Sequence, residues 1–326
     1  MRHRDLTLHA CGHALRHNLG VAAGESVLVV TDALRRRIGE AFAESARDLT
    51  PDVDIDVIPV GERNGAEPPR STALKMAAAD VALLVTEQSL SWTNARKTAT
   101  DRGTRVASMP RLDESILRRT LTIDYETVRD RVKRVCDQLD RTARVQVTTS
   151  AGTDLTFSIE GRRAHGRKGG IYREPGQWGN LPCGEAFVAP VEGSGRGVYV
   201  VDASHAGVGK LAEPIRVRVE DGRAVSIEGG REAARLRRLL ESVGESEAYQ
   251  LAEFGIGCNH AAHICGITLE DEKVLGTCHL ALGRNDLFGG TVHASVHVDG
   301  VLTDPTVLLD GEKLSIDEGG PGPASR

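Results

Sequence analysis

The first hundred residues alternate short apolar runs with segments whose apolar residues recur at helical spacing. The strand-like runs span residues 26–31, 53–60, 81–86 and 105–109. The helix-like segments span residues 34–49, 71–79 and 92–101. This alternation is typical of parallel strands covered by helices, so we predict an α/β, Rossmann-like three-layer domain. After Val30 the sequence reads TDALRRR without a glycine, so the phosphate-binding turn of dinucleotide-binding domains is missing.

The pattern changes in the middle of the chain. A charged segment over 125–141 has apolar residues at helical spacing and predicts one long helix. From Ala143 onward, short strands alternate with glycine-rich turns. We therefore predict two domains, with residues 1–142 forming the Rossmann-like domain and residues 143–326 a strand-rich α+β domain that binds metal. An Asp-Gly pair predicts a closing hairpin over 306–316, and the tail GGPGPASR is expected to be disordered.

Composition narrows the classes of partner and compartment. The formal net charge is −5 with basic and acidic residues intermixed, so we expect no nucleic-acid partner. No apolar run is long enough to span a bilayer, and the first residues lack the apolar core of a signal peptide. We expect a cytoplasmic protein with no membrane partner. The six cysteines are scattered without a CxxC pair, which matches no zinc framework and indicates a reducing compartment.

Residues 253–299 hold the densest concentration of histidines, carboxylates and glycines in the chain. In ASVHVDG, strict alternation predicts a strand on which Ser295, His297 and Asp299 point to one side. The segment TCHLAL alternates in the same way and places His279 on a second strand, opposite its apolar neighbours. An imidazole and a carboxylate on one face suit zinc, iron, manganese or cobalt. A lone strand histidine is more often an ordinary surface or core group, so further ligands are needed from elsewhere.

Carboxylates outside these two strands supply candidate ligands. Glu185 follows a proline and a glycine in NLPCGEAFVAP, which presents its carboxylate at the start of a strand, although a solvated turn acid has the same pattern. Glu253 opens the histidine-rich stretch. The basic, glycine-rich segment 162–179 predicts a loop, either on the surface or over the site as a lid. The acidic run 270–272 fits a helix start or a turn better than a set of ligands.

These residues together resemble a known family. Four motifs resemble those of the metallo-aminopeptidases named for aminopeptidase T and aminopeptidase S, in the same order and with similar gaps. They are NLPCGEAFVAP, AEFGIGCN, CHLALG and HVDG. The resemblance implies a two-metal site held by Glu185, Glu253, His279, His297 and Asp299. Two zinc, cobalt or manganese ions would occupy it, with Glu185 or Glu253 bridging the ions or assisting the bound water.

The function that this resemblance implies is a metal-dependent aminopeptidase-type hydrolase, which uses metal-activated water on a small peptide. It also implies a homodimer. The family's aminopeptidases carry a tyrosine after the histidine of HLALG, but the corresponding segment RNDLF at 284–288 offers no phenol. This departure bears on peptidase activity and leaves metal binding untouched.

Two alternatives stay open. The same superfamily includes 2,5-dihydroxypyridine dioxygenase, a ring-cleaving enzyme with one iron held by two histidines and one carboxylate. Under this alternative His279, His297 and Asp299 hold one Fe(II), Glu185 and Glu253 support these ligands, and the substrate is a small molecule. The candidate acids or bases are then His260, His263 and His293. A solvated strand-end position is the simpler interpretation of the last of these. The second alternative is a non-catalytic metal-binding scaffold.

Overall fold

The computed structural model describes residues 3–317, and the chain forms two compact units. The first unit comprises Met1–Glu126 and Gly170–Cys183, and the second comprises Thr127–Gly169 and Gly184–Arg326. The chain thus returns to the first unit after it has entered the second. The predicted boundary after residue 142 differs from this partition in two places. Most of the helix before it belongs to the second unit, and Gly170–Cys183 belongs to the first unit. The division into two independent domains stays a prediction. The tail GGPGPASR lies outside the described residues.

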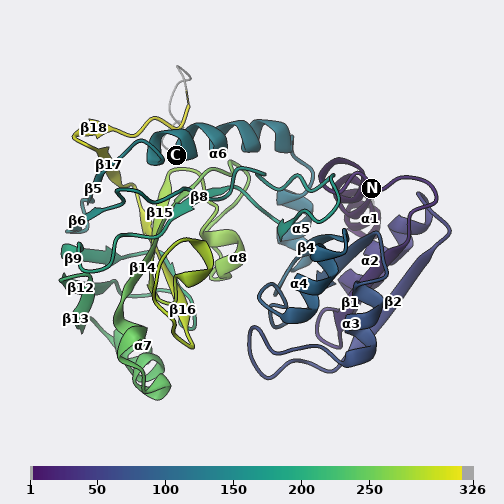
Figure 1. Cartoon of the computed structure of the whole chain (residues 1–326), viewed down its shortest axis with the longest axis horizontal. Helices are drawn as coiled ribbons and strands as arrows, with labels where there is room; N and C mark the ends of the chain where they lie inside the picture. The colour runs from purple at the N-terminus through teal and green to yellow at the C-terminus, as the bar shows by residue number, and fades with distance from the viewer. Residues whose placement is uncertain (1–2, 318–326) are drawn as a thin grey trace. The chain divides into compact units, whose positions relative to one another are not determined.

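The first unit is built on a five-stranded parallel sheet with the strand order β2-β1-β3-β4-β7 (Figure 1). Its elements are α1 (His3–His13), η1 (Ala14–Asn18), β1 (Val27–Asp32), α2 (Arg36–Arg47), β2 (Val53–Ile58), α3 (Arg70–Met76), β3 (Val81–Val85), α4 (Asn94–Asp101), β4 (Arg105–Ser108), α5 (Glu114–Thr120) and β7 (Trp178–Asn180). Strands β1, β3 and β4 are buried throughout, and β3 and the first four residues of β1 are accordingly apolar runs in the sequence. The predicted α/β class is confirmed.

Helices cover this sheet through regularly spaced apolar residues. Helix α2 buries Ile38, Phe42 and Ala46, which recur every four residues, and it packs against β1 and β2. Helix α5 lies in a stretch whose sequence pattern is ambiguous. Asp113 precedes its first residue and caps it, because the Asp113 carboxylate accepts a hydrogen bond of 2.8 Å from the backbone N–H of Ile116. This capping bond satisfies one of the free N–H groups at the helix start.

The second unit contains two antiparallel sheets. The seven-stranded sheet, in the order β13-β12-β9-β6-β5-β17-β18, consists of β5 (Arg144–Thr148), β6 (Asp154–Ser158), β9 (Arg196–Val201), β12 (Ile215–Glu220), β13 (Arg223–Glu228), β17 (Thr306–Leu309) and β18 (Glu312–Lys313). The six-stranded sheet, in the order β11-β10-β16-β15-β14-β8, consists of β8 (Glu185–Val188), β10 (Ser204–His205), β11 (Gly209–Lys210), β14 (Leu251–Gly257), β15 (Thr277–Gly283) and β16 (His297–Thr303).

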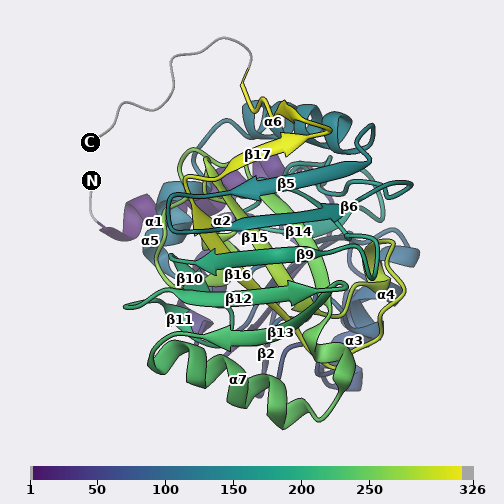
Figure 2. The same cartoon turned by 90° about the vertical axis from the view of Figure 1, so that its left-hand side faces the viewer.

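Figure 2 shows strands β5, β6, β9, β12 and β13 crossing in front of β14, β15 and β16. The rings of Phe157 on β6 and Phe254 on β14 meet edge to face, with centroids 5.2 Å apart. The inner faces of the two sheets therefore form the core of this unit, and the other face of the six-stranded sheet is left for polar side chains.

The remaining elements complete the second unit. They are α6 (Tyr125–Leu139), α7 (Arg231–Val243), η2 (Ser246–Tyr249), α8 (Thr268–Asp271) and η3 (Asp286–Phe288). The predicted hairpin is formed by β17 and β18, and both turn residues, Asp310 and Gly311, have positive φ. Between residues 3 and 317, no helix combines the length and the apolar character needed to cross a membrane. The cytoplasmic location and the homodimer stay predictions.

Candidate active site

One face of the six-stranded sheet carries all five predicted site residues. Strand β15 lies between β14 and β16, and the register aligns Glu253, Ala281 and Asp299 in one row across the three strands. Directly paired residues project from the same face of a sheet. The small methyl group of Ala281 therefore leaves space between the two carboxylates.

The neighbouring rows add the other three residues, and each of them lies opposite a glycine. The pairs are His279–Gly255, His297–Gly283 and Glu185–Gly257. Because a glycine has no side chain, each imidazole or carboxylate has room to lean across the next strand. The alternation of TCHLAL and of HVD in the sequence thus predicted the correct face for both histidines and for Asp299.

The imidazole of His279 lies in close contact with the glycine that pairs with it. A Cβ atom at Gly255 would lie 2.1 Å from Nε2 and 2.2 Å from Cε1 of His279, so the imidazole lies directly over this glycine. From there, His279 Nε2 reaches 3.1 Å from Glu253 Oε1 and 3.6 Å from Glu185 Oε2. The glycine is therefore a structural requirement for the histidine to meet both carboxylates.

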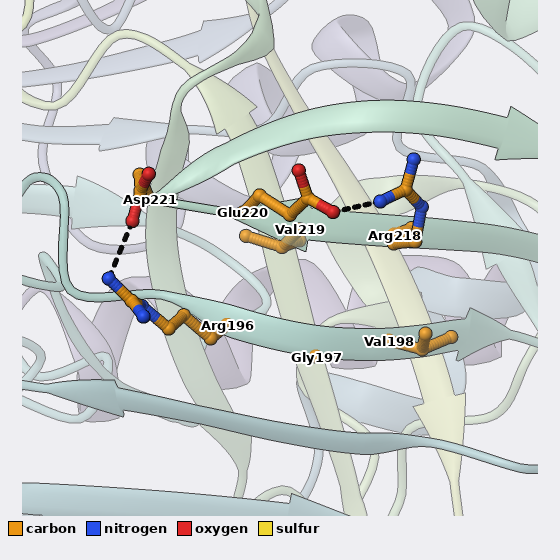
Figure 3. Close-up of a pocket in the computed structure, with 7 residues that line it drawn as sticks. All are labelled: Arg196, Gly197, Val198, Arg218, Val219, Glu220 and Asp221. Atoms are coloured by element: carbon orange, nitrogen blue, oxygen red, sulfur yellow. Dashed lines mark hydrogen bonds and ion pairs between the residues drawn. The ribbon is translucent and has the colours of Figure 1, made fainter.

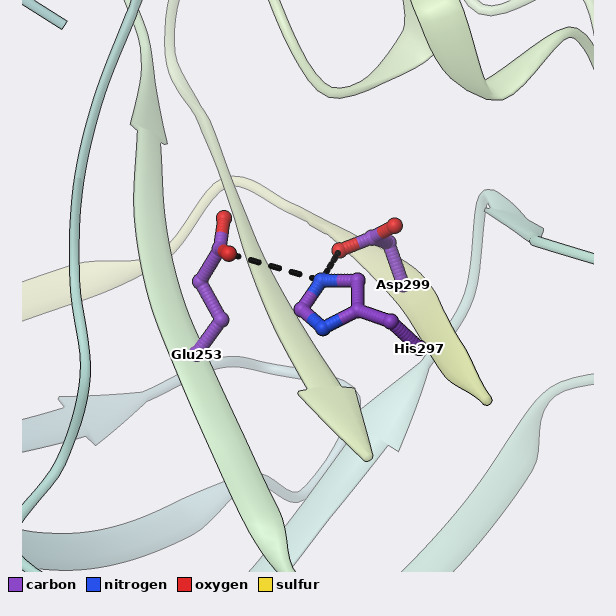
Figure 4. A group of neighbouring side chains, drawn as sticks. All are labelled: Glu253, His297 and Asp299. Atoms are coloured by element: carbon purple, nitrogen blue, oxygen red, sulfur yellow. Dashed lines mark ion pairs between the residues drawn. The ribbon is translucent and has the colours of Figure 1, made fainter. Parts of the chain in front are cut away.

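Glu253, His297 and Asp299 form the closest cluster (Figure 4). Each offers one ligand atom, and these atoms all lie within 4.8 Å of one another. His297 Nε2 is 3.4 Å from Glu253 Oε2 and 3.3 Å from Asp299 Oδ1. Its Nδ1 donates a 2.7 Å hydrogen bond to the carbonyl of Arg284, which orients Nε2 toward the carboxylates. The His297 side chain is 30% exposed, so the cluster opens to solvent on this side.

The electrostatics of the cluster favour a positive charge among the carboxylates. Burial would lower the pKa of His297, but the charges of Asp299 and Glu253 and their hydrogen bonds raise it well above its ordinary value. Burial would also lower the pKa of His279, but the hydrogen bond to Glu253 and the neighbouring carboxylates raise it to about 9. Burial would raise the pKa of Asp299, but His297 holds it far below its usual range. A divalent cation can supply the same positive charge in place of these protons, so the donor set fits a metal.

A buried lysine borders the cluster, and the sequence analysis did not select it. The Lys273 side chain is fully buried, and its Nζ lies 2.9 Å from Glu185 Oε1. It also contacts the carboxylate of Glu272. Burial raises the pKa of Glu272 to about 8, although the ammonium of Lys273 opposes this shift. In the sequence, a lysine after the run Glu-Asp-Glu is typical of a solvated charged segment, so its burial is visible only in the fold.

Aromatic rings lie next to His297. The ring of Phe288 meets His297 edge to face at 5.8 Å and Phe187 at 5.6 Å between centroids. His165 stacks on Phe187 at 5.5 Å. Burial lowers the pKa of His165, against a hydrogen bond with the backbone of Phe288 that raises it, so this imidazole is neutral near pH 7. His165 lies in the segment 162–179 that was predicted as a loop. Up to residue 177 this segment contains no helix and only an isolated bridge from His165 to Phe187, but its last two residues belong to β7, so the prediction is wrong at that end.

The other candidate histidines lie outside the cluster. The His293 side chain is 79% exposed and pairs with Asp286 at 3.0 Å, as the solvated interpretation predicted. His260 is exposed, with Nδ1 3.0 Å from Arg131, and His263 is also exposed. None of the three is among the grouped ligand atoms.

The acidic run 270–272 has a structural role. Glu270 accepts a hydrogen bond from the backbone N–H of His263, and Asp271 accepts bonds from the backbone N–H groups of Cys265 and Gly266. These two carboxylates therefore stabilise a turn, as predicted. All six cysteines are free thiols, in agreement with the absence of a disulfide framework in the sequence.

A separate hollow of about 400 Å³ lies along β9 and β12 (Figure 3). Its lining residues are Arg196, Gly197, Val198, Arg218, Val219, Glu220 and Asp221. The charged side chains are paired with one another, with Arg196 2.7 Å from Asp221 and Arg218 in contact with Glu220. None of the five predicted site residues lines it, so this hollow is not part of the site.

Known proteins resemble this chain in sequence family and in fold. A family model described as 2,5-dihydroxypyridine 5,6-dioxygenase (NicX) matches residues 7–320. The solved structure of 2,5-dihydroxypyridine dioxygenase from Pseudomonas putida KT2440 is 22% identical with a TM-score of 0.80, covering 98% of this chain and 99% of that chain. Wild-type AmpT from Thermus thermophilus is 20% identical with a TM-score of 0.68, covering 96% and 98%. At these identities the two structures show a shared fold. No curated protein matches the sequence.

These findings correct the predicted activity. The prediction of an aminopeptidase-type hydrolase or metalloprotease is wrong, because the matching family model describes a dioxygenase. The segment without a phenol agrees with the correction, since Phe288 of that segment packs its apolar ring against His297. The dioxygenase family, which the sequence analysis kept as an alternative, is the one that the family model matches. The two solved structures, one of a dioxygenase and one of AmpT, share the fold of this chain.

The family match extends over nearly the whole chain. It includes the parallel sheet of the first unit and the strands β8, β14, β15 and β16 that carry the site. Such a match identifies an enzyme family rather than a non-catalytic scaffold. The chain therefore belongs to the family of 2,5-dihydroxypyridine 5,6-dioxygenase.

Proposed function

We propose that this protein is a metal-dependent dioxygenase that opens the ring of 2,5-dihydroxypyridine, or of a close hydroxypyridine analogue, between C5 and C6. The observation that carries the proposal is the cluster of Glu253, His297 and Asp299 beside an aromatic wall, in a chain of this family. In this reaction both atoms of O2 enter the product. C5 becomes a carboxyl carbon and C6 a formyl carbon on nitrogen, so no external reductant is consumed.

The donor set supports a single redox-active divalent ion, with Fe(II) as the first candidate. One imidazole and two carboxylates would hold it, namely His297, Glu253 and Asp299. The chemistry that such an ion supplies when bound is the activation of O2 toward an electron-rich ring. The hydrogen bond from His297 Nδ1 to the carbonyl of Arg284 keeps Nε2 directed at the ligand position.

The neighbouring side chains are suited to a planar aromatic substrate. The rings of Phe288 and Phe187 offer apolar surface next to His297, which can hold a pyridine ring and exclude water from one side. His165 is neutral near pH 7 and stacks on Phe187, so its imidazole can accept a proton from a substrate hydroxyl. No serine or cysteine nucleophile is required.

Oxygen uptake tests the proposal. The protein is loaded anaerobically with Fe(II) and mixed with 2,5-dihydroxypyridine in an oxygen electrode, and we expect one O2 consumed per ring opened. With ¹⁸O2, both labelled atoms should appear in the product. Absence of oxygen uptake by fully loaded protein, with this compound and its monohydroxylated analogues, would contradict the proposed function.

A substitution in the aromatic wall refines the test. Phe288→Ala removes the ring next to His297, and the loss of an aromatic contact worth about 0.5–1.5 kcal/mol predicts a rise in KM of about two- to twelvefold. Leu287→Ala is the matched control, because Leu287 is the residue next to Phe288 in the sequence and its side chain is exposed. Equal KM values for the two variants would show that the wall does not contact the substrate.

A further inference from the structure

The connection between β15 and β16 begins with a loop, residues 284–292, that makes two contacts with His297. One is the hydrogen bond that His297 Nδ1 donates to the carbonyl of Arg284, and the other is the ring of Phe288. We propose that Glu192 is a positioning residue of the site, because its carboxylate fixes this loop and so holds Arg284 and Phe288 against His297. The inference rests on the proposed function and adds a residue that acts on the site through the loop.

Glu192 follows β8 in the chain and reaches the loop across the fold. Its Oε1 accepts a 2.9 Å hydrogen bond from the backbone N–H of Thr291 and a 3.0 Å hydrogen bond from Asn285 Nδ2. Its Oε2 contacts the guanidinium of Arg162, which also donates to the carbonyl of Gly289. The pair of Glu192 and Arg162 therefore holds the loop on both sides of its aromatic residue.

The surroundings of Glu192 favour the ionised carboxylate. Burial would raise its pKa, but hydrogen bonds from the backbone of Thr291 and from its own backbone, the hydrogen bond from Asn285 and the charge of Arg162 hold the pKa below its ordinary value. The Glu192 side chain is 24% exposed and that of Arg162 15%, so solvent screens the pair only in part. Hydrogen bonds to an ionised acceptor are stronger than those between neutral groups. One carboxylate is thus a firm anchor for the loop.

Asn285 extends this anchoring through the rest of the loop. Its side chain is fully buried, and its Oδ1 accepts a 2.8 Å hydrogen bond from the backbone N–H of Val292. Its backbone N–H donates to the carbonyl of the same residue at 3.1 Å. Gly290 lies against the amide, since a Cβ there would be 2.0 Å from Asn285 Cγ. The loop is closed on itself around Phe288, which is 8% exposed.

Loss of the Glu192 carboxylate would act on His297 through this loop. The backbone N–H of Thr291, the buried amide of Asn285 and the guanidinium of Arg162 would lose their acceptor. Leaving buried donors unsatisfied costs more than an average hydrogen bond contributes, so the loop is expected to open. The carbonyl that orients His297 belongs to this loop. Partners of this kind typically change metal affinity by about 10–100-fold.

Cleavage by trypsin tests whether Glu192 holds the loop. Metal-free Glu192→Ala is expected to be cut after Arg284 about tenfold faster than wild type, the change in open population when one hydrogen bond to a charged group is lost. Asp202→Ala is the matched control. It removes a half-buried carboxylate that also accepts one backbone and one side-chain hydrogen bond, but at Thr303, the end of β16 away from His297. Cleavage of wild type and Glu192→Ala at equal rates, or equally fast cleavage of the control, would overturn the inference.

Binding of Co²⁺, followed by its visible absorption, tests whether the loop acts on the site. Glu192→Ala is expected to raise the Kd for Co²⁺ by about tenfold, whereas Asp202→Ala should match wild type. An unchanged Kd in Glu192→Ala would contradict the inference. If Glu192→Ala does not fold, Glu192→Gln replaces it in both measurements, with the same direction of change expected and the same result overturning the inference.

Turnover separates this inference from the proposed function. In the Fe(II)-loaded enzyme, Glu192→Ala is expected to raise the KM for 2,5-dihydroxypyridine no more than Phe288→Ala does, and to add nothing in the Phe288→Ala background. An equal increase in both backgrounds would contradict the inference. Faster cleavage and weaker Co²⁺ binding in Glu192→Ala, with no oxygen uptake by wild type, speak against the proposed function alone. Native cleavage and native Co²⁺ binding in Glu192→Ala, with an active wild type, speak against the inference alone.

Discussion

The glycine under His279 provides a quantitative test of the site's construction. In Gly255→Ala the new Cβ would lie 2.1 Å from Nε2, far below the 3.0 Å that real contacts respect. The imidazole must move and lose its 3.1 Å contact with Glu253. Overpacking costs about 1–3 kcal/mol, and a lost hydrogen bond to a charged group about 1.5–3 kcal/mol. We expect the free energy of unfolding to fall by the sum of these two costs, about 2.5–6 kcal/mol.

The assay is urea unfolding of chelator-treated protein, followed by far-ultraviolet circular dichroism and arranged as a double-mutant cycle. In a His279→Ala background the ring is absent, so the methyl group of Gly255→Ala has room and costs little. The predicted coupling energy is about 2.5–6 kcal/mol, because the overpacking and the loss of the hydrogen bond both require the ring that the second substitution removes.

The matched control is Gly276→Ala, since a Cβ at this position meets no atom within 4 Å. Its φ of +87° makes alanine unfavourable there, and the resulting loss of stability should be the same with and without the His279 ring. If Gly255→Ala costs the same in both backgrounds, the ring does not depend on the glycine and the reasoning is refuted.

Two further predictions concern metal and pH. His297→Ala with Asp299→Ala removes two of three close donors, so elemental analysis should find no bound metal, while the fluorescence of Trp92 and Trp178 in the first unit stays native; full metal occupancy would refute the assignment. The pKa of His279 is raised from 6.5 to about 9 in the folded protein. Protonated His279 therefore stabilises the metal-free fold by about 3 kcal/mol. This stabilisation is complete below pH 6.5 and is lost as the pH rises through 9. Urea unfolding across this range should show the decline, and an unchanged slope in His279→Asn would contradict it.

The chemistry was harder to predict than the position of the site. Motifs around Glu185, Glu253 and the HVD strand led to a resemblance that includes the dioxygenase family, but they also led to the wrong activity. The solved structures of a dioxygenase and of AmpT both share this fold, so the fold by itself does not separate the two activities. The contacts that the sequence did not indicate are those of Phe288 with His297 and of Lys273 with Glu185. Neither contact has a local sequence pattern, since the partners are joined by the fold rather than by spacing along the chain.

Local periodicity determined much of this protein. Alternation with a period of two is a backbone property, so it predicted the strands and the shared side of His297 and Asp299 before any tertiary contact was known. The β-α alternation likewise predicted the parallel sheet of the first unit. Only the tertiary structure decided which strands are neighbours and in which register. That register sets His279 over Gly255, because distances between strands depend on packing across the whole sheet. The buried lysine reaches Glu185 from the turn after α8, which is again a contact between segments that are distant in the sequence.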